Sequence, residues 1–259
     1  MKIAIIGAGN MGGATARGLA MGLHVDTKDI FVSNPSKGKL DAIKAEYPQI
    51  NITQDNKECV READMVIIAV KPWKVEELAK EIAPELKNEK VIIGSMAAGI
   101  STDKVASLFG YQHPVYLIIP NTAIAVRQSM TFITGRNTTP DMDSEVMAIF
   151  RELGQAMLVE ERLMGAGMAR ASCGIAYAMR YIRAATEGGV ELGMYAQDAQ
   201  HIVEQTLKGA VALLQANGSH PETEIDRVTT PGGITIRGLN AMEENGFTNS
   251  VIKGLKASR

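Results

Sequence analysis

Short apolar segments alternate with polar, helix-compatible segments over roughly the first 135 residues of the chain. The apolar segments are rich in β-branched residues and comprise residues 2–6, 30–33, 65–70, 91–93 and 115–119. They are hydrophobic continuously rather than in alternation, which is typical of parallel strands that helices cover on both sides. The segments between them, such as 39–47 and 75–82, have the helical period. The pattern predicts an α/β fold with a doubly wound parallel sheet.

The pattern changes after about residue 160, where strand-like runs give way to Ala-, Met- and Leu-rich segments with helical spacing. The clearest helices are expected at 176–191 and 196–216, and the second is followed by Asn217 and Gly218, a common helix stop. A further helix is expected to begin near Gly233 and end at Gly246. We therefore expect two domains, an α/β domain over residues 1–158 and an all-helical domain over residues 159–259.

The expected helix at 196–216 is apolar around much of its circumference. Its apolar residues include Ile202, Val203, Leu207, Val211, Leu213 and Leu214. Because a helix that is apolar nearly all round must be buried, a tight homodimer is the simplest explanation. The alternative is a monomeric helical bundle that covers this helix with its own chain.

Charge and cysteine content narrow the functional classes. The formal net charge is −2, and the Lys and Arg residues are scattered rather than clustered, which argues against a nucleic-acid partner. Cys59 and Cys173 are far apart and have no ligand-like spacing to the four histidines, so neither a disulfide framework nor a metal site is expected. A reducing compartment, the cytoplasm, fits this composition best.

Two apolar stretches resemble targeting or membrane segments, but both are interrupted. The N-terminal run ends at Gly7, too early for a signal-peptide core. Residues 105–126 lack Asp, Glu, Lys and Arg but contain Pro114, Pro120 and Asn121, so we expect a helix end, loops and a buried strand there rather than a membrane span.

The first predicted strand runs into Gly7-Ala8-Gly9-Asn10-Met11-Gly12, which fits the pattern G-x-G-x-x-G. In a strand–turn–helix context, the first glycine permits a tight turn and the second allows close approach of a pyrophosphate. The third glycine lets the helix pack on the strand, and the helix N-terminus attracts phosphate. The motif predicts a Rossmann-type dinucleotide site formed by Gly7, Gly9, Asn10, Met11 and Gly12. A turn that serves only packing is the alternative.

The end of the second predicted strand bears on the choice of cofactor. NAD-binding domains usually have Asp or Glu there, whereas this chain has Ser33, Asn34, Ser36 and Lys37. A carboxylate would repel a 2′-phosphate, while hydroxyl, amide and ammonium groups can donate to it. We therefore expect NADP(H) to be preferred, with NAD(H) possible. The alternative is that Lys37 and Lys39 belong to a solvated helix face.

Further strand ends should meet at the same edge of the sheet, since the carboxyl ends of parallel strands line the ligand crevice. The candidates there are Val70, Lys71, Pro72, Ala97, Ala98, Gly99 and Asn121. Small residues such as those at 97–99 permit close approach of a flat ring. Lys71 places a cation near the cofactor or an anionic substrate. Each of these segments alone is a common structural turn.

The segment 229–235 reads Thr-Thr-Pro-Gly-Gly-Ile-Thr and precedes a predicted helix. Hydroxyl groups and a Gly-Gly pair at a helix N-terminus form a small anion site suited to a carboxylate. Thr230, Gly232, Gly233 and Thr235 are the candidate substrate-binding residues, and an N-cap with a flexible entry is the alternative. We find no Ser-His-Asp or Cys-His arrangement indicating covalent catalysis.

Taken together, these motifs resemble the pyrroline-5-carboxylate reductase family over the whole chain. The matching segments are GAGNMG at 7–12, AVKP at 69–72, AAGI at 97–100, PNT at 120–122, CGIAY at 173–177, QT at 205–206 with KGA at 208–210, and VTTPGGIT at 228–235. The resemblance implies NAD(P)H-dependent reduction of 1-pyrroline-5-carboxylate to proline. It also implies a Rossmann domain and a helical domain that interlocks with that of a partner in a dimer, larger rings of dimers, and an active site shared between subunits.

The resemblance also implies roles for individual residues. Asn56 would contact the cofactor ribose, Lys71 and the 97–100 loop would line the nicotinamide pocket, and the TPGG loop would hold the substrate. We expect Thr235 to hydrogen-bond the ring nitrogen and relay a proton, which makes Thr235 and Lys71 the candidate catalytic residues. The chain departs from the family pattern at Leu117, where Arg is common, and at Ala123 and Ile175.

Two alternative functions remain open at this point. A related imine reductase or hydroxyacid dehydrogenase has similar architecture, but the dehydrogenase should have a lysine acid in the first long helix of the second domain. This chain offers Tyr177, Arg180 and Arg183 there. The departures from the family pattern would also fit a degenerate cofactor-binding protein with a regulatory or scaffold role.

Overall fold

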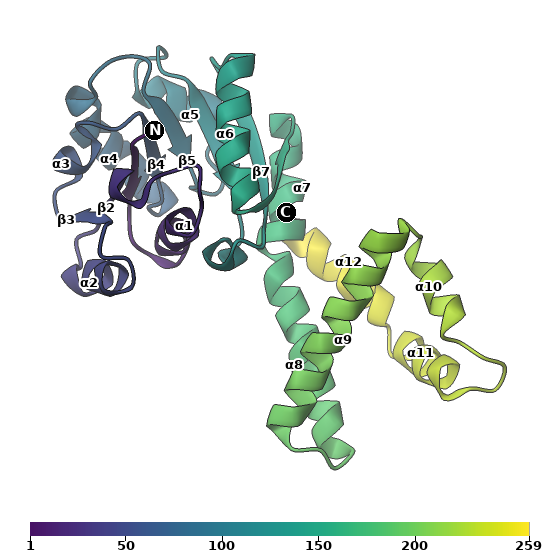
Figure 1. Cartoon of the computed structure of the whole chain (residues 1–259). Coiled ribbons are helices and arrows are strands. Elements are labelled where there is room, and N and C mark those ends of the chain that lie inside the picture. The colour runs from purple at the N-terminus through teal and green to yellow at the C-terminus, as the bar shows by residue number, and fades with distance from the viewer. Residues whose placement is uncertain (259) are drawn as a thin grey trace. The chain divides into compact units, whose positions relative to one another are not determined.

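The computed structural model describes residues 1–258, which form two compact units (Figure 1). The first unit is Met1–Cys173 and the second starts at Gly174. Residues 159–173 therefore pack with the α/β unit, and buried Met164 belongs to one of its apolar clusters. A domain boundary after residue 158, based on the change in sequence character, stays a prediction.

The first unit is built on an eight-stranded sheet with the order β3-β2-β1-β4-β5-β6-β7-β8. The strands are β1 (Ile3–Ile6), β2 (Ile30–Ser33), β3 (Asn51–Thr53), β4 (Met65–Ile68), β5 (Ile92–Ser95), β6 (Val115–Ile119), β7 (Ser129–Arg136) and β8 (Gly154–Leu158). All neighbours pair in parallel except β6 and β7, which are antiparallel. The predicted doubly wound sheet is confirmed.

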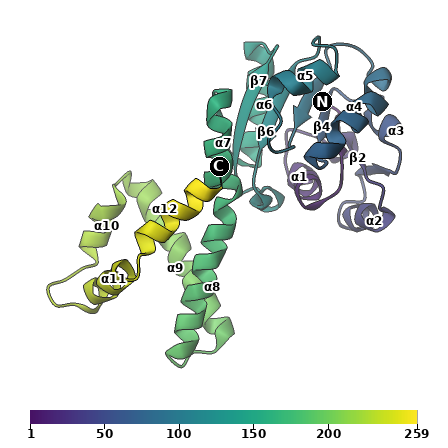
Figure 2. The same ribbon diagram turned by 180° about the vertical axis from the view of Figure 1, so that it is seen from behind.

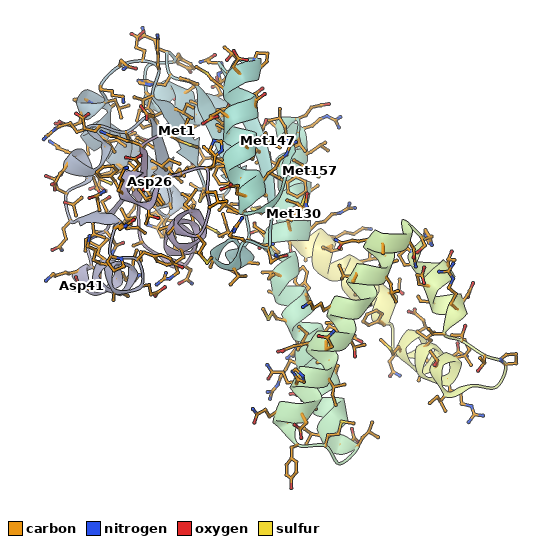
Figure 3. All side chains as sticks on the ribbon, viewed as in Figure 1. Met1, Asp26, Asp41, Met130, Met147 and Met157 are labelled. Carbon is orange, nitrogen blue, oxygen red and sulfur yellow. The ribbon has the colours of Figure 1, made fainter. Side chains whose placement is uncertain are left out.

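Sequence patterning missed the strands β3, β7 and β8. The strand β3 has only three residues, and in the first five residues of β7 buried positions alternate with partly exposed ones. At the outer edge, β8 leaves Met157 half exposed, whereas Met147 of the neighbouring helix is buried (Figure 3). None of the three therefore has the continuous apolar pattern of a central strand.

Helices cover both faces of the sheet. They are α1 (Asn10–Ala20), α2 (Lys37–Glu46), α3 (Asn56–Val60), α4 (Val75–Ile82), α5 (Thr102–Leu108), α6 (Pro140–Glu152), α7 (Met164–Gly167) and the π-helix Met168–Ser172, with 3₁₀ turns at Thr27–Asp29, Pro72–Lys74, Ala83–Glu85, Thr122–Val126 and Glu161–Leu163. Side chains of α1, α2 and α6 pack on Ile3 and Ile5, while those of α3, α4 and α5 pack on Ala4 and Ile6. Since successive strand residues point to opposite faces, the fully apolar β1 supplies both cores.

The second unit contains only helices (Figure 2). These are α8 (Gly174–Glu191), α9 (Ala196–Asn217), α10 (Pro221–Arg227), α11 (Ile234–Glu244) and α12 (Phe247–Ala257). The expected helices at α8, α9 and α11 are confirmed, while α10 and α12 were not anticipated. Among residues 174–258 only Thr186 and Ala199 are buried.

Several apolar side chains of α9 are only about half covered by their own chain. Ile202 is 49% exposed, Val211 53% and Leu213 54%. This exposure fits the expectation that another copy of the chain covers them. None of the helices within residues 1–258 combines the length and apolar character needed to cross a bilayer.

The loop after α1 is fixed by the carboxylate at the end of α6. Glu152 Oε2 accepts hydrogen bonds from the backbone N–H groups of Leu23 and His24 at 2.8 and 2.9 Å. Arg127 donates to the carbonyl oxygens of Glu152 and Met21. Partial burial acts to raise the pKa of Glu152, but the backbone donors and the charge of Arg127 outweigh it and hold that pKa below its usual value.

Replacing Glu152 with Gln is expected to lower the free energy of unfolding by about 1–2 kcal/mol at pH 7, since a charged acceptor is lost. The depressed pKa makes this contribution fully present above the ordinary value of 4.5 and lost as the pH falls through the folded-state pKa. We expect urea denaturation at equal protomer concentration to give a smaller difference in the free energy of unfolding between wild type and E152Q at about pH 3.5 than at pH 7. An equal difference in unfolding free energy at both pH values would contradict the role given to the ionised Glu152. The control is E160Q, which changes an exposed ion pair with Arg162.

Candidate active site

The glycine-rich turn between β1 and α1 is packed tightly on its inner side. Gly7 has φ +102°, a left-handed conformation that favours glycine, and its N–H donates to the Ser33 carbonyl oxygen at 2.8 Å. A Cβ at Gly12 would lie 1.9 Å from the Gly7 carbonyl oxygen. Both glycines are therefore required by the turn itself.

The outer side of the same turn is open. A Cβ at Gly9 would meet no atom within 4 Å, and Gly9 caps α1 without a side chain. The first turn of α1 contains no acidic residue, so no carboxylate of that turn competes for the free amides that follow Asn10. Asn10 is exposed and Met11 partly exposed. This arrangement fits a pyrophosphate held by backbone amides.

Asn34 connects the glycine turn to the next helix. Its Oδ1 accepts from the Ala8 N–H at 3.0 Å, and its Nδ2 donates to the Ser36 carbonyl oxygen at 3.1 Å. The side chain is buried. Asn34 therefore holds the glycine turn and the start of α2 together, and a direct contact with a cofactor stays a prediction.

The N-terminus of α2 presents the features expected of a 2′-phosphate site. Ser36 caps the helix without a side-chain cap bond, and both Ser36 and Lys37 are exposed. No acidic residue lies in the first turn. A hydroxyl, an ammonium and free backbone amides are thus available to an anion.

Ser33 lies at the end of β2, and Asn56 lies at the start of α3. The Ser33 hydroxyl donates to Asn56 Oδ1 at 2.8 Å, and Asn56 Nδ2 donates to Glu81 Oε2 of α4 at 3.1 Å. Glu81 was not a predicted site residue. It lies 25 residues from Asn56 in the sequence, and no local pattern marks it.

The loops after β4 and β5 complete this edge of the sheet. Val70 lies beside the glycine turn, since a Cβ at Gly7 would approach its Cγ1 to 3.3 Å. Lys71 is exposed, and its ammonium makes no ion pair or hydrogen bond with residues 1–258. Pro72 begins a 3₁₀ turn.

In the 97–100 loop, Ala97 is buried while Ala98 and Gly99 are exposed. The loop is fixed at its far end by Glu161, whose carboxylate accepts from Thr102 N at 2.9 Å and from Thr102 Oγ1 at 2.5 Å. Sequence reasoning missed Glu161, because nothing near it in the chain indicates a partner 59 residues away.

Asn121, the remaining predicted cofactor residue, is buried and its side chain is engaged within the protein. Its Oδ1 accepts from Ala123 N, and its Nδ2 donates to the Ala171 carbonyl oxygen at 3.3 Å. These bonds connect the turn after β6 to the π-helix. The structure therefore gives Asn121 a positioning role, and a cofactor contact stays a prediction.

The TPGG loop belongs to the helical unit. Gly232 has φ +71°, and the Gly233 N–H donates to the Thr230 carbonyl oxygen at 2.9 Å. Gly233 caps α11, whose first turn has no acidic residue, and Thr235 is exposed in that turn. Arg237 donates to the Gly232 carbonyl oxygen at 3.1 Å. This arginine was missed, although its place one turn into the predicted helix could have identified it.

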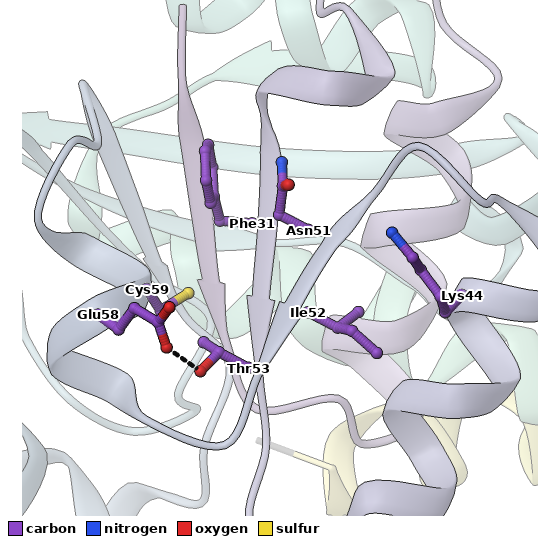
Figure 4. Close-up of a pocket in the computed structure, with 7 residues that line it drawn as sticks. All are labelled: Phe31, Lys44, Asn51, Ile52, Thr53, Glu58 and Cys59. Atoms are coloured by element: carbon purple, nitrogen blue, oxygen red, sulfur yellow. Dashed lines mark hydrogen bonds between the residues drawn. The ribbon is translucent and has the colours of Figure 1, made fainter.

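A separate cavity of about 360 Å³ lies at the β3 edge and contains none of the predicted site residues (Figure 4). Its lining residues are Phe31, Lys44, Asn51, Ile52, Thr53, Glu58 and Cys59. Burial raises the pKa of the Cys59 thiol to about 12, which keeps it protonated and unreactive at neutral pH. Within residues 1–258 no group of three His, Cys, Asp or Glu side chains is placed to hold a metal ion.

Two family models match the chain. Residues 161–259 match "Pyrroline-5-carboxylate reductase dimerisation", and residues 2–99 match "NADP oxidoreductase coenzyme F420-dependent". The first match, together with the exposed apolar face of α9, supports a homodimer.

Named relatives match over almost the whole chain. Pyrroline-5-carboxylate reductase 2 of Dictyostelium discoideum is 37% identical, covering 99% of this chain and 90% of its own. The pyrroline-5-carboxylate reductase of Escherichia coli is 31% identical, covering 98% and 94%. The crystal structure of Plasmodium falciparum pyrroline carboxylate reductase with NADP bound superposes with a TM-score of 0.90 at 26% identity, covering 100% of this chain and 95% of that one.

A methyl group at Gly9 is expected to fill the open side of the glycine turn without disturbing the fold, since it meets no protein atom. G9A should keep the melting temperature of the wild type and bind NADPH at least about tenfold more weakly, as judged by nicotinamide fluorescence. The matched variant G12A should instead be destabilised by about 1–3 kcal/mol, because its Cβ overlaps a backbone oxygen. Wild-type NADPH affinity in G9A would exclude the proposed cradle.

Proposed function

Because the chain belongs to the pyrroline-5-carboxylate reductase family, we propose that it reduces 1-pyrroline-5-carboxylate to proline with NADP(H) as the preferred cofactor. The observation that carries the proposal is the joint presence of an open glycine cradle at α1 and a TPGG loop at α11. In the balanced reaction, NADPH and one proton add two hydrogens across the C=N bond of the substrate.

The protein supplies the cofactor site through groups suited to anions. The amides after Gly9 would hold the pyrophosphate, and Ser36, Lys37 and the first amides of α2 would hold the 2′-phosphate. The small 97–99 loop would leave room for the nicotinamide ring. When bound, the reduced nicotinamide supplies the hydride for the imine carbon.

The substrate is a planar cyclic imine with a carboxylate. The amides of Gly232 and Gly233 and the N-terminus of α11 would fix the carboxylate, supported by the positive charge of Arg237. The Thr235 hydroxyl would hydrogen-bond the ring nitrogen and relay its proton, and the exposed ammonium of Lys71 would attract the anionic ligands. A protonated imine is already electrophilic, so orientation alone can supply up to about 7–11 kcal/mol of the required acceleration.

The proposal also includes a homodimer and a cytoplasmic location. The dimerisation domain and the exposed face of α9 support a homodimer, and larger rings of dimers would be built from it. The two thiols are free, in keeping with a reducing cytoplasm. The buried Leu117 leaves no cation at the position where the family commonly has Arg, so Arg237 and Lys71 would provide the positive charge.

NADPH oxidation with 1-pyrroline-5-carboxylate tests the proposal, and T235A is expected to lower kcat/KM by at least about tenfold, or about 1.4 kcal/mol. T235S should recover most of the activity because it keeps the hydroxyl, and T223A, on an exposed part of α10, is the control. NADPH binding without turnover in the wild type would indicate a regulatory or scaffold protein. Turnover only with another imine or a hydroxyacid would indicate a related oxidoreductase.

Charge reversal at Lys37 should affect the KM for NADPH and the KM for NADH differently. K37E is expected to raise the KM for NADPH about tenfold or more through loss of a charge-assisted bond, and to change the KM for NADH less than about twofold. The control K39E lies on the same exposed stretch of α2. If K39E had the same effect, Lys37 would belong merely to a charged helix face.

A further inference from the structure

Ser33, Asn56 and Glu81 form a chain of hydrogen-bonded side chains whose direction is set at one end. Ser33 Oγ donates to Asn56 Oδ1 at 2.8 Å, and Asn56 Nδ2 donates to Glu81 Oε2 at 3.1 Å. Ser33 has no exposed surface, while Asn56 and Glu81 are partly buried. The three residues come from β2, α3 and α4.

The carboxylate of Glu81 decides which way the Asn56 amide faces. An ionised carboxylate can only accept hydrogen bonds, whereas an amide has a donating and an accepting end. With the amide reversed, the Asn56 oxygen would face the Glu81 oxygen, and two acceptors would oppose each other. Asn56 must therefore turn its NH₂ toward Glu81 and its oxygen toward Ser33.

This orientation determines what Asn56 can offer to a ligand. The Ser33 hydroxyl is fully buried and donates its one proton to the Asn56 oxygen, so Ser33 holds the amide and does not itself face a ligand. Asn56 keeps its second N–H. The partly buried Asn56 side chain thus presents a donor, which a ribose hydroxyl oxygen can accept.

Resting on the proposed function, we infer that Glu81 is a positioning residue that, with Ser33, orients Asn56 for the adenosine ribose of the cofactor. The end of the second strand is where a dinucleotide-binding fold meets this ribose. Contacts with a 2′-phosphate then fall to Ser36, Lys37 and the amides of α2. Without the Glu81 carboxylate the Asn56 amide is free to reverse. Binding must then fix its orientation, which lowers the affinity for the cofactor.

The test compares dissociation constants for NADH and NADPH, measured by nicotinamide fluorescence, in the full-length protein. E81A is expected to weaken NADH binding about three- to tenfold, the loss of one oriented hydrogen bond. E81M keeps the side-chain length without an acceptor and should weaken NADH binding to the same extent as E81A. E81Q should stay within about twofold of wild type because its amide oxygen can still accept. The control E77Q changes an exposed carboxylate one turn earlier on α4.

NADH is the decisive ligand, because removing a negative charge would by itself favour NADPH. In steady state, the KM for NADH should rise with the dissociation constant, while kcat stays within about twofold. In an N56A background, E81A should have less than about a twofold effect, since Glu81 acts through Asn56. An undiminished effect in that background, or wild-type NADH affinity in E81A and E81M, would overturn the inference. Failure of the wild type to bind either cofactor would instead overturn the proposed function, and this inference with it.

Discussion

Burial of both faces of one parallel sheet is the constraint on which the predicted cofactor site depends. A strand such as β1, whose four residues are all fully or nearly fully buried, is stable only while helices cover it from two sides. Right-handed crossovers then bring the chain back to the same edge after each helix. As a result, the segments after β1, β2, β4 and β5 meet at one edge, although they are spread over a hundred residues of sequence.

Hydrophobic burial brings these segments together, but polar side chains decide their exact placement. Asn34 holds the glycine turn against the start of α2, and Glu161 fixes the end of the 97–100 loop through Thr102. Asn121 does the same for the turn after β6. A buried polar group that loses its partner costs more than the bond contributes, so each connection has one favoured arrangement. The loops at this edge are therefore preorganised by residues that do not themselves need to touch a ligand.

The central strands, the helices on both faces and the glycine turn could be predicted from the sequence, because each depends on a local pattern. The antiparallel strand β7 and the edge strand β8 could not, since their burial is partial and depends on neighbours that are distant in the chain. The same distinction holds for the site. Ser36 and Lys37 were predicted from their place after β2, whereas Glu81 and Glu161 make their hydrogen bonds to residues 25 and 59 positions away in the chain. Asn34 and Asn121 were predicted from their position at strand ends, and in the structure their side chains are hydrogen-bonded within the protein.

The helical unit is subject to a different constraint. With only Thr186 and Ala199 buried among residues 174–258, it has little core of its own, and several apolar residues on α9 stay about half exposed in the protomer. The TPGG loop belongs to this unit, and its shape depends on the local bonds at Gly233 and Arg237 and on the position of α11. The helix α11 likewise has no buried residue within the protomer, which fits the homodimer that the matched dimerisation domain supports. The predicted dinucleotide site thus lies on a unit with its own core, whereas the predicted substrate loop lies on a unit whose own chain buries few of its residues.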